Sequence, residues 1–393
     1  MTPQASAVAV EAQAQRVSRP LFMLALFCVA HLFVDLYSMA LSAMQPVLID
    51  RFRMTLTQAG FLSGLMVFAS SVMQPLYGYL SDRFHTRMFT VLAPAVAAVF
   101  ISSLGLAPAY WALIPMVFLG GAGVASFHPQ ATANATAGFE YRQRFMAIFI
   151  SAGTVGLSLG PTYFSLAIKN LGFTNTWVAA IPGVIVSIFL FWYLKFSPSR
   201  SASESRFDLG ALRFVWKPMT IHYFLVFLRS VVQVTFAQLM PLYLHIQRGY
   251  PTMEASYFTT LYMFAGALGG FIGGNLADGF GGRRIILISM LGCVPFLLLF
   301  VLTEGWISIA GLVLGASILL FTIPVNVTMA QELAPKQAGT VSALMMGFSW
   351  GMAGMIFIPL TGWVSDHFSM QHAFTGLVMF PLIGFFLALK LKR

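Results

Sequence analysis

The sequence predicts an all-α membrane protein with twelve transmembrane helices in two pseudo-symmetric bundles of six. Hydrophobic residues make up 58% of the 393 positions and charged residues only 9%, whereas soluble domains hold roughly 45–50% and about 25%. The apolar residues also gather in runs of about 20, the length that a helix needs to cross a ~30 Å hydrocarbon layer. We therefore expect most of the chain to lie within a lipid bilayer.

Dividing the apolar runs at charged residues, glycines and prolines gives two sets of six spans. The first set covers residues 21–48, 57–80, 88–106, 109–134, 143–168 and 176–196, and the second covers 218–246, 254–277, 284–302, 305–331, 339–364 and 372–390. The predicted organisation is a disordered cytoplasmic tail (1–20), an N-terminal six-helix bundle (21–196), a cytoplasmic linker (197–217) and a C-terminal six-helix bundle (218–393).

The basic residues predict the orientation of these helices. Seventeen of the 22 Lys and Arg residues lie on one set of alternating loops and tails, four lie on the opposite loops, and Arg229 lies inside a predicted helix. Cytoplasmic loops carry an excess of basic residues, so we expect both termini in the cytoplasm of a bacterium and the helices in its inner membrane. The net charge of +10 then favours contact with membrane lipids rather than with nucleic acid.

The sequence offers no sign of enzymatic machinery or of a cofactor. Cys28 and Cys293 lie inside predicted spans without a CxxC pair, which predicts neither a disulfide nor a metal site. No G-x-x-x-x-G-K-[ST] loop occurs, so ATP is not the expected energy source. We expect no cofactor, no metal and no enzyme, although His31, Asp35 and His128 are a conceivable catalytic set.

The two halves share a local repeat. GYLSDRFHTR from Gly78 has a counterpart in GNLADGFGGRR from Gly274, each after the second span of its half, and Asp82 and Asp278 are 196 residues apart. A half-chain repeat around a charged central loop is typical of transporters whose two bundles rock about a central site.

Four residues of the first copy carry a resemblance to a known family. Gly78, Asp82, Arg83 and Arg87 spell G-x-x-x-D-R-x-x-x-R, which resembles the signature loop of the major facilitator superfamily. The resemblance implies a latch of the outward-facing state, in which glycine permits close helix contact and aspartate accepts from a helix N-terminus. The alternative is that the arginines are only positive-inside anchors.

The second copy departs from that signature. Asp278 and Arg283 match it, but Gly279 replaces the arginine expected after the aspartate. In the first copy His85 stands where the family usually has glycine. We therefore expect the second latch to be weaker.

Four further segments carry a narrower resemblance. Asp35 in HLFVDLY, RMTLTQAGFLSG from Arg53, QPLYGYLSD from Gln74 and FHPQ from Phe127 look like the fosmidomycin-resistance type of exporter. This resemblance implies proton-coupled drug efflux and antibiotic resistance. Gln130 stands where those relatives usually carry glutamate, which puts one expected proton or cation site in doubt. The segment SAGTVGLSLGP from Ser151 loosely resembles the glycine-rich signature of superfamily exporters, or serves simple helix packing.

A polar stripe follows the first predicted helix. His31, Asp35, Ser38, Ser42 and Gln45 recur at steps of four and three, which places them on one helix face. A charge at the bilayer centre costs about 2.5–3.5 kcal/mol, so it usually faces water or a partner. We expect the stripe to line a cavity and Asp35 to be the proton-coupling site; the alternative is a permanently ionised structural partner.

The seventh helix carries the complementary charge. Arg229, with Gln233 one turn further, lies close to the repeat-equivalent position of Asp35. We expect Arg229 to bind an anionic group of the substrate, for which a guanidinium fork is suited. The alternatives are an ion pair with Asp35 or another acid, and a snorkelling structural cation.

The remaining candidate residues lie on the fourth and tenth helices. His128, before Pro129, is predicted to relay protons together with His31, or else to fix a kink. Gln130, Ser38 and Asn326 complete the predicted substrate contacts.

These observations favour a monomeric secondary active transporter. The leading interpretation is a proton-coupled antiporter that exports a small drug-like or anionic organic molecule by alternating access. The alternatives are a proton-coupled importer of an organic anion and a non-transporting receptor on the same fold. The expected partners are the substrate, protons and membrane lipids.

Overall fold

The computed structural model describes residues 20–139, 142–194 and 215–391. Within these ranges the regular structure is helical, and twelve spans are long and apolar enough to cross a membrane. The predicted fold class is confirmed. The predicted tail (1–20) and linker (197–217) lie almost wholly outside the described residues, so these two boundaries stay predictions.

The N-terminal bundle contains the first six spans. They are formed by α2 (Pro20–Ser38) with α3 (Ala40–Phe52), α4 (Leu56–Ser71) with α5 (Gln74–Phe84), α6 (Met88–Ser102) with η1 (Ser103–Leu106), α7 (Tyr110–Asn134), α8 (Arg142–Leu171), and η2 (Phe173–Ala180) with α9 (Ile181–Tyr193). Several helices run a few residues past the predicted ends, because polar residues at a membrane surface do not stop a helix.

The C-terminal bundle contains the other six spans. They are formed by α11 (Trp216–Arg248), α12 (Thr252–Phe280), α13 (Gly282–Leu302), α14 (Gly305–Leu320) with α15 (Thr322–Leu333), the turn η4 (Pro335–Gln337) followed by α16 (Ala338–Ser342), the π-helix η5 (Ala343–Phe348) and α17 (Ser349–His367), and α18 (Met370–Val378) with α19 (Phe380–Ala388).

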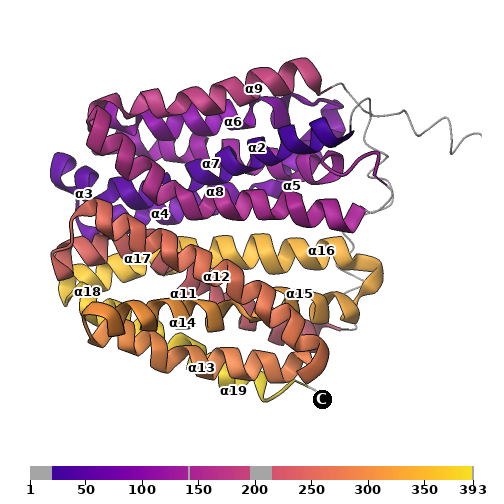
Figure 1. Ribbon diagram of the computed structural model, residues 1–393, viewed down its shortest axis with the longest axis vertical. Coiled ribbons are helices and arrows are strands. Elements are labelled where there is room, and N and C mark those ends of the chain that lie inside the picture. The colour runs from indigo at the N-terminus through magenta and orange to yellow at the C-terminus, as the bar shows by residue number, and fades with distance from the viewer. Residues whose placement is uncertain (1–19, 140–141, 195–214, 392–393) are drawn as a thin grey trace, which may run out of the picture.

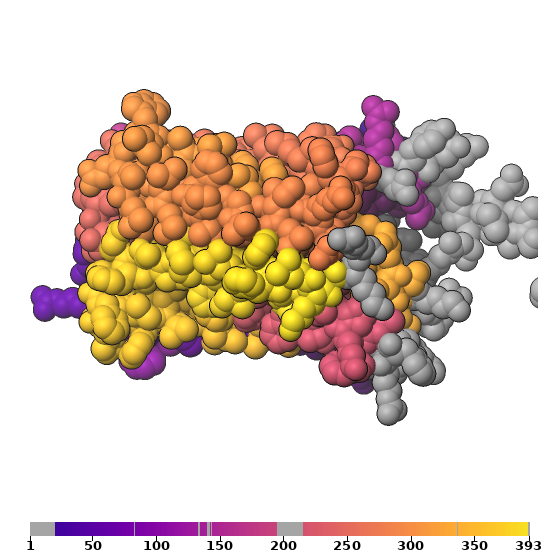
Figure 2. All heavy atoms as spheres, turned by 90° about the horizontal axis from the view of Figure 1, so that it is seen from below, coloured from indigo at the N-terminus to yellow at the C-terminus, as the bar shows by residue number. Residues whose placement is uncertain are grey.

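The two bundles lie side by side with their helices roughly aligned (Figure 1). We call the end where α2 and α11 begin and α19 finishes the basic end, and the opposite end, which carries Phe52, Gly249 and Phe368, the far end. The outer surface is apolar, as a lipid-facing surface must be. Figure 2 shows α19 beside α13, and here Ile288, Leu291, Ile383 and Phe386 are all exposed.

Several spans are interrupted along their length, and three of these, the first, second and eleventh, bear on the site described below. The first is broken at Met39, whose φ is −101° and ψ 0°, and the second turns at Val72 and Met73 between α4 and α5. The eleventh contains the π-helix η5. Discontinuous helices and π-turns often lie at binding sites in membrane transporters, because they free backbone groups and aim side chains inward.

Contacts between the bundles gather between mid-depth and the far end. Among the described residues, the hydrogen bonds that join the bundles include Gln238 to the Met39 sulfur at 3.5 Å and the hydroxyls of Thr162 and Thr260 at 2.8 Å. The other hydrogen bonds between the bundles are accepted by Asp366 of α17 from Leu56 and Thr57 of α4. At the far end α4 packs directly on α17, where a Cβ on Gly60 would lie 2.7 Å from the carbonyl oxygen of Ile358. The far end is therefore closed.

Candidate functional site

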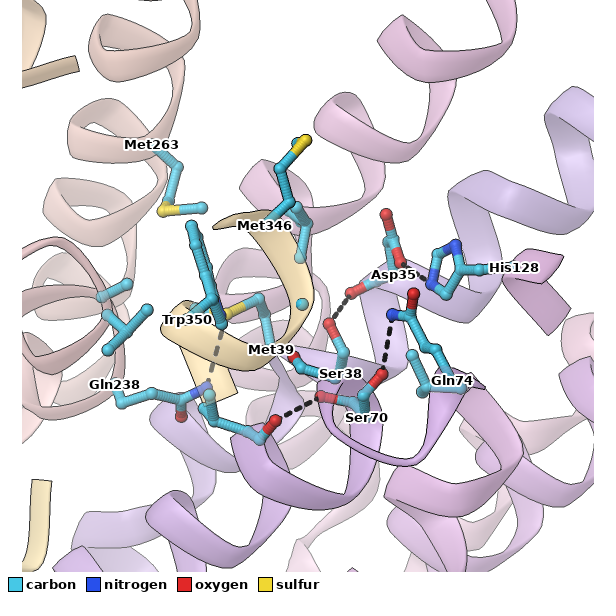
Figure 3. Close-up of a pocket in the computed structure, with 17 residues that line it drawn as sticks. Asp35, Ser38, Met39, Ser70, Gln74, His128, Gln238, Met263, Met346 and Trp350 are labelled. Carbon is cyan, nitrogen blue, oxygen red and sulfur yellow. Dashed lines mark hydrogen bonds and ion pairs between the residues drawn. The ribbon is translucent and has the colours of Figure 1, made fainter. Parts of the chain in front are cut away.

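A cavity of about 300 Å³ lies between the bundles, at the interruptions of the first, second and eleventh spans. That volume is at the lower end of small-molecule pockets. Its wall is drawn in Figure 3 and consists of Asp35, Ser38, Met39, Val67, Ser70, Ser71, Gln74, Val124, His128, Leu157, Val234, Ala237, Gln238, Met263, Met346, Gly347 and Trp350.

The wall has a polar side and an apolar side. The N-terminal bundle supplies the ionisable groups, Asp35 and His128, together with three serines and Gln74. The C-terminal bundle supplies mainly apolar and sulfur-containing surface, including Met263, Met346 and Trp350. No Lys or Arg is among these wall residues.

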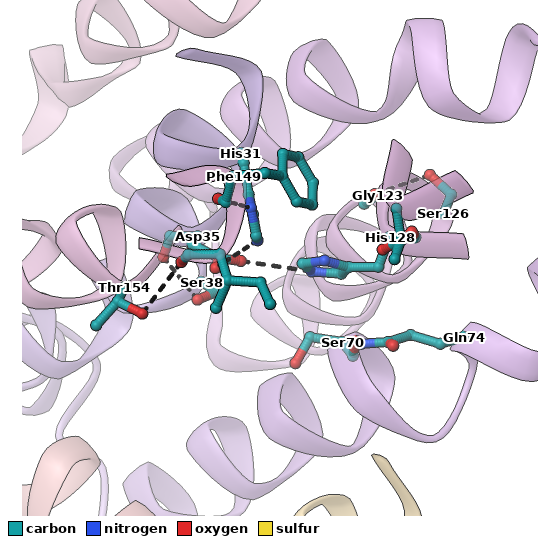
Figure 4. Close-up of polar contacts among 12 residues, drawn as sticks. His31, Asp35, Ser38, Ser70, Gln74, Gly123, Ser126, His128, Phe149 and Thr154 are labelled. Atoms are coloured by element: carbon teal, nitrogen blue, oxygen red, sulfur yellow. Dashed lines mark hydrogen bonds and ion pairs between the residues drawn. The ribbon is translucent and has the colours of Figure 1, made fainter. Parts of the chain in front are cut away.

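Asp35 lies between two histidines from different parts of the N-terminal bundle (Figure 4). Its Oδ2 is 3.2 Å from Nε2 of His31, one turn earlier on α2, and its Oδ1 is 3.4 Å from Nε2 of His128 on α7. Asp35 is 7% exposed, and it is the only buried acid among those whose side chains the structure describes. The structure thus brings the three predicted proton-coupling residues together.

The hydrogen bond between His31 and the Phe149 carbonyl determines the protonation of the contact between His31 and Asp35. Its Nδ1 is 2.9 Å from the carbonyl oxygen of Phe149 on α8, and because a carbonyl only accepts, Nδ1 carries a hydrogen. A neutral His31 would then turn the lone pair of Nε2 toward a carboxylate oxygen 3.2 Å away. Two acceptors repel at that distance, so a proton belongs between them.

Helix α8 makes room for this pair. A Cβ on Gly153 would lie 2.3 Å from Nε2 of His31 and 2.6 Å from Oδ2 of Asp35. One and two turns on, Cβ atoms on Gly156 and Gly160 would meet the carbonyl oxygens of Leu32 and Leu36. The packing interpretation of the glycine-rich segment is confirmed, and Gly153 is a site residue that the sequence analysis missed.

We call His31, Asp35 and His128 the triad. One ring nitrogen from each histidine and one carboxylate oxygen of Asp35 lie within 4.8 Å of one another, which suits one shared small cation. A proton is the cation that the hydrogen bond of His31 already requires. The expected absence of a metal and of a cofactor stays a prediction.

Arg229 lies on α11 in the C-terminal bundle and is not among the residues that line the cavity. It is 4% exposed, its Nη2 donates to Ser230 Oγ at 3.1 Å, and its Nε and Nη1 have no partner. Among the described side chains no carboxylate lies within ion-pair distance of it, and the structure does not join it to Asp35. Its neighbour Gln233 also has an unpartnered Oε1. Within the part of the chain that the structure describes, Arg229 is therefore a buried cation without a counter-ion.

The other predicted substrate contacts have different surroundings. Ser38 lines the cavity and donates to the Asp35 carbonyl at 2.7 Å. Gln130 accepts from the Thr90 hydroxyl at 2.8 Å and donates to the Thr86 carbonyl at 2.8 Å. A carboxylate could not make that second bond, so glutamine ties α7 to the start of α6. Asn326 lies 3.2 Å from Nδ1 of His222, away from the wall.

The predicted latch residues make contacts within their own bundles. Arg83 donates to the Tyr79 hydroxyl at 3.0 Å, Arg87 lies over the ring of Phe191 at 5.4 Å, and Arg283 donates to the Leu389 carbonyl at 3.1 Å. A Cβ on Gly78 would lie 3.6 Å from the Cβ of Pro129, an ordinary packing distance. Asp278 is exposed. The side chain of Asp82 lies outside the described residues. The latch role stays a prediction.

Comparisons with known proteins agree with this architecture. The model of the Major Facilitator Superfamily matches residues 26–357 and 254–393. The chain is 27% identical to a fosmidomycin resistance protein of Escherichia coli over 98% of this chain and 96% of that protein. It is also 27% identical to an uncharacterized MFS-type transporter, YfnC, of Bacillus subtilis, over 91% and 89%. A bacterial homolog of the human lysosomal transporter Spinster, solved in an inward-facing conformation, superposes with a TM-score of 0.78 at 15% identity, over 94% of this chain and 96% of that one.

Proposed function

Since the chain belongs to the Major Facilitator Superfamily of transporters, we propose that it is a proton-coupled antiporter of the bacterial inner membrane. It exports a small drug-like or anionic organic molecule by alternating access, with the basic end in the cytoplasm. Its similarity to a fosmidomycin resistance protein supports export. The positive-inside distribution of Lys and Arg supports the orientation.

One observation carries the proposal: Asp35, whose contact with His31 requires a shared proton, lies on the cavity wall. Asp35 and His128 line the cavity, whereas His31 does not. A proton therefore reaches His31 through Asp35, from whichever side of the membrane the cavity faces. Because the triad joins α2, α7 and α8, loss of that proton weakens contacts between three helices of one bundle, which is how protonation biases the bundle's position.

Cargo and proton compete at Asp35. A cargo molecule with a polar group at the N-terminal wall hydrogen-bonds to Asp35 or His128, and its apolar part lies against Met263, Met346 and Trp350. Such binding favours release of the proton, and re-protonation favours release of the cargo. An amphipathic molecule small enough for about 300 Å³ fits this arrangement.

Arg229 favours a second candidate, uptake of an organic anion by proton symport. Among the described residues, its Nε and Nη1 are buried donors without acceptors, and leaving such groups unpaired costs about 1–3 kcal/mol or more. An anion that reached Arg229 in another conformation would satisfy them. The direction of transport separates this candidate from export.

The test is cargo-induced proton flux in liposomes that contain an interior pH dye. Phosphonates, lipophilic cations and organic acids are added to the protein, to Asp35→Asn and to Asp50→Asn, an exposed acid at the far end that serves as control. We expect one class to dissipate a preformed proton gradient with the protein and the control only. The sign of the flux distinguishes antiport from symport. Transport by Asp35→Asn with unchanged dependence on the gradient would show that Asp35 is structural.

A further inference from the structure

At the far end, a single carboxylate joins the two bundles. Asp366, at the end of α17, accepts from the Leu56 amide at 2.8 Å, the Thr57 amide at 2.8 Å and the Thr57 hydroxyl at 2.5 Å. Leu56 and Thr57 begin α4, in the other bundle, 310 and 309 residues earlier in the chain. Among the described residues this is the only hydrogen bonding between the bundles that involves an ionisable group.

These contacts complete a helix cap that is incomplete without them. The first amides of a helix have no partner inside it. At the start of α4, Thr55 and Gln58 form a reciprocal capping box that satisfies the amides of both residues. The two amides between them, those of Leu56 and Thr57, donate their hydrogen bonds to Asp366. A carboxylate at a helix N-terminus also interacts favourably with the helix dipole.

Gly362, one turn before Asp366, permits the approach. Its virtual Cβ would lie 2.2 Å from the carbonyl oxygen of Leu56 and 2.9 Å from Cα of Thr57. No side chain fits there, so α17 meets the start of α4 backbone to backbone. The carboxylate and the glycine act on the same two residues.

The segment that carries Asp366 repeats the segment that carries Asp82. Residues 76–84 read LYGYLSDRF and residues 360–368 read LTGWVSDHF, with Leu, Gly, Ser, Asp and Phe at matching positions. The first segment ends the second span at the basic end, and the second ends the eleventh span at the far end. At the basic end the start of α16 has no side-chain cap, in contrast to the capped start of α4.

We propose that Asp366 is a far-end latch, which stabilises the conformation in which the cavity is closed toward the outside of the cell. Opening the far end separates α17 from α4 and returns the amides of Leu56 and Thr57 to water. The matching segment at residues 76–84 gives the same pair of spans a second aspartate at the opposite end. Each aspartate then favours one of two alternating conformations.

The experiment measures the width of the far end directly. Spin labels are attached at Ala109→Cys and Glu304→Cys, two exposed far-end positions in different bundles, after Cys28 and Cys293 are replaced by alanine. Distributions of the distance between the two labels are compared for the labelled protein with Asp366 intact, with Asp366→Asn and with Asp50→Asn. Because hydrogen bonds to a charged group are lost, Asp366→Asn should raise the population with the wide distance on the order of five- to tenfold, and Asp50→Asn should leave it unchanged.

A second variant separates the latch from general destabilisation. Gly362→Ala keeps the carboxylate but places a methyl group against Leu56, so it should also widen the far end while the protein stays folded and monodisperse. Equal distributions for Asp366→Asn and Asp50→Asn would overturn the proposal. So would widening by Gly362→Ala alone, because packing without the carboxylate would then explain the closure. The distances require neither cargo nor a proton gradient, so this outcome is independent of the proposed antiport.

Discussion

Asp35 and His31 form a contact that cannot exist without a proton between them. Their facing atoms are 3.2 Å apart, and the other nitrogen of the His31 ring is occupied by the Phe149 carbonyl. The cavity reaches Asp35 but not His31, which is not among the wall residues. Under the proposed function, a carboxylate with one face on the cavity and the other on a histidine would respond both to cargo and to the supply of protons.

Replacing His31 with glutamine should uncouple transport. A glutamine can still donate to the Phe149 carbonyl, but it cannot carry the shared proton, so cargo-driven proton flux should fall by roughly 10²-fold. Exchange of labelled cargo without a gradient should persist. His222→Gln is the matched control, a buried histidine of the other bundle that faces Asn326 rather than an acid. Equal loss of flux in both variants would refute a special role for His31.

Gly153→Ala should damage the same site without changing any polar group. The added methyl would lie 2.6 Å from the Asp35 carboxylate, and overpacking of this kind costs typically 1–3 kcal/mol. We expect a lower thermal midpoint and a loss of proton coupling together. Gly376→Ala, where a Cβ meets no atom within 4 Å, should alter neither. Normal coupling in Gly153→Ala would mean that the pair tolerates displacement.

Substitution of Arg229 should reveal the charge of the cargo. If an anionic group reaches its unpartnered nitrogens, Arg229→Gln should weaken transport of the anion by about tenfold or more and spare a neutral analogue. Arg229→Lys keeps the charge and should restore part of the activity. The measurement is KM for the anionic and the neutral member of one cargo series. A similar loss for both members would assign Arg229 a structural role.

Trp350→Ala should weaken binding of the apolar part of the cargo. The indole lies on the cavity wall beside Met346 and Gly347, and losing such a contact should raise KM roughly tenfold, which corresponds to about 1.4 kcal/mol. The effect should grow with the apolar length of the cargo. Trp363→Ala, on the exposed side of the same span, is the control. An unchanged KM in Trp350→Ala would place the cargo elsewhere.

The sequence predicted what depends on spacing along one helix. Asp35 and His31 are one turn apart on α2, so their contact follows from helix geometry. Hydropathy was sufficient for the twelve spans. The contact between His128 and Asp35 could not be derived from spacing, because no local pattern tells which face of α7 turns toward α2.

The rest depends on how separate helices are rotated and docked. Arg229 and Asp35 are close in repeat position, but the Arg229 side chain is buried and donates to the adjacent Ser230. Gln130 was predicted to contact the substrate, and its two hydrogen bonds to Thr90 and Thr86 involve its amide group instead. Asp366 drew no attention because its partners are more than 300 residues away. The repeat of its segment at residues 76–84 was the available signal.

The π-helix η5 gives the eleventh span an adjustable register. A π-turn holds one more residue than an α-turn, so its conversion to α-helix would rotate α16 by about 100° and shift it by about 1.5 Å relative to α17. The segment that would change is Ala343–Phe348, which includes the wall residues Met346 and Gly347. Such a conversion would turn the part of the eleventh span that lies toward the basic end, and with it the cavity wall at Met346 and Gly347, while α17 stays packed on α4.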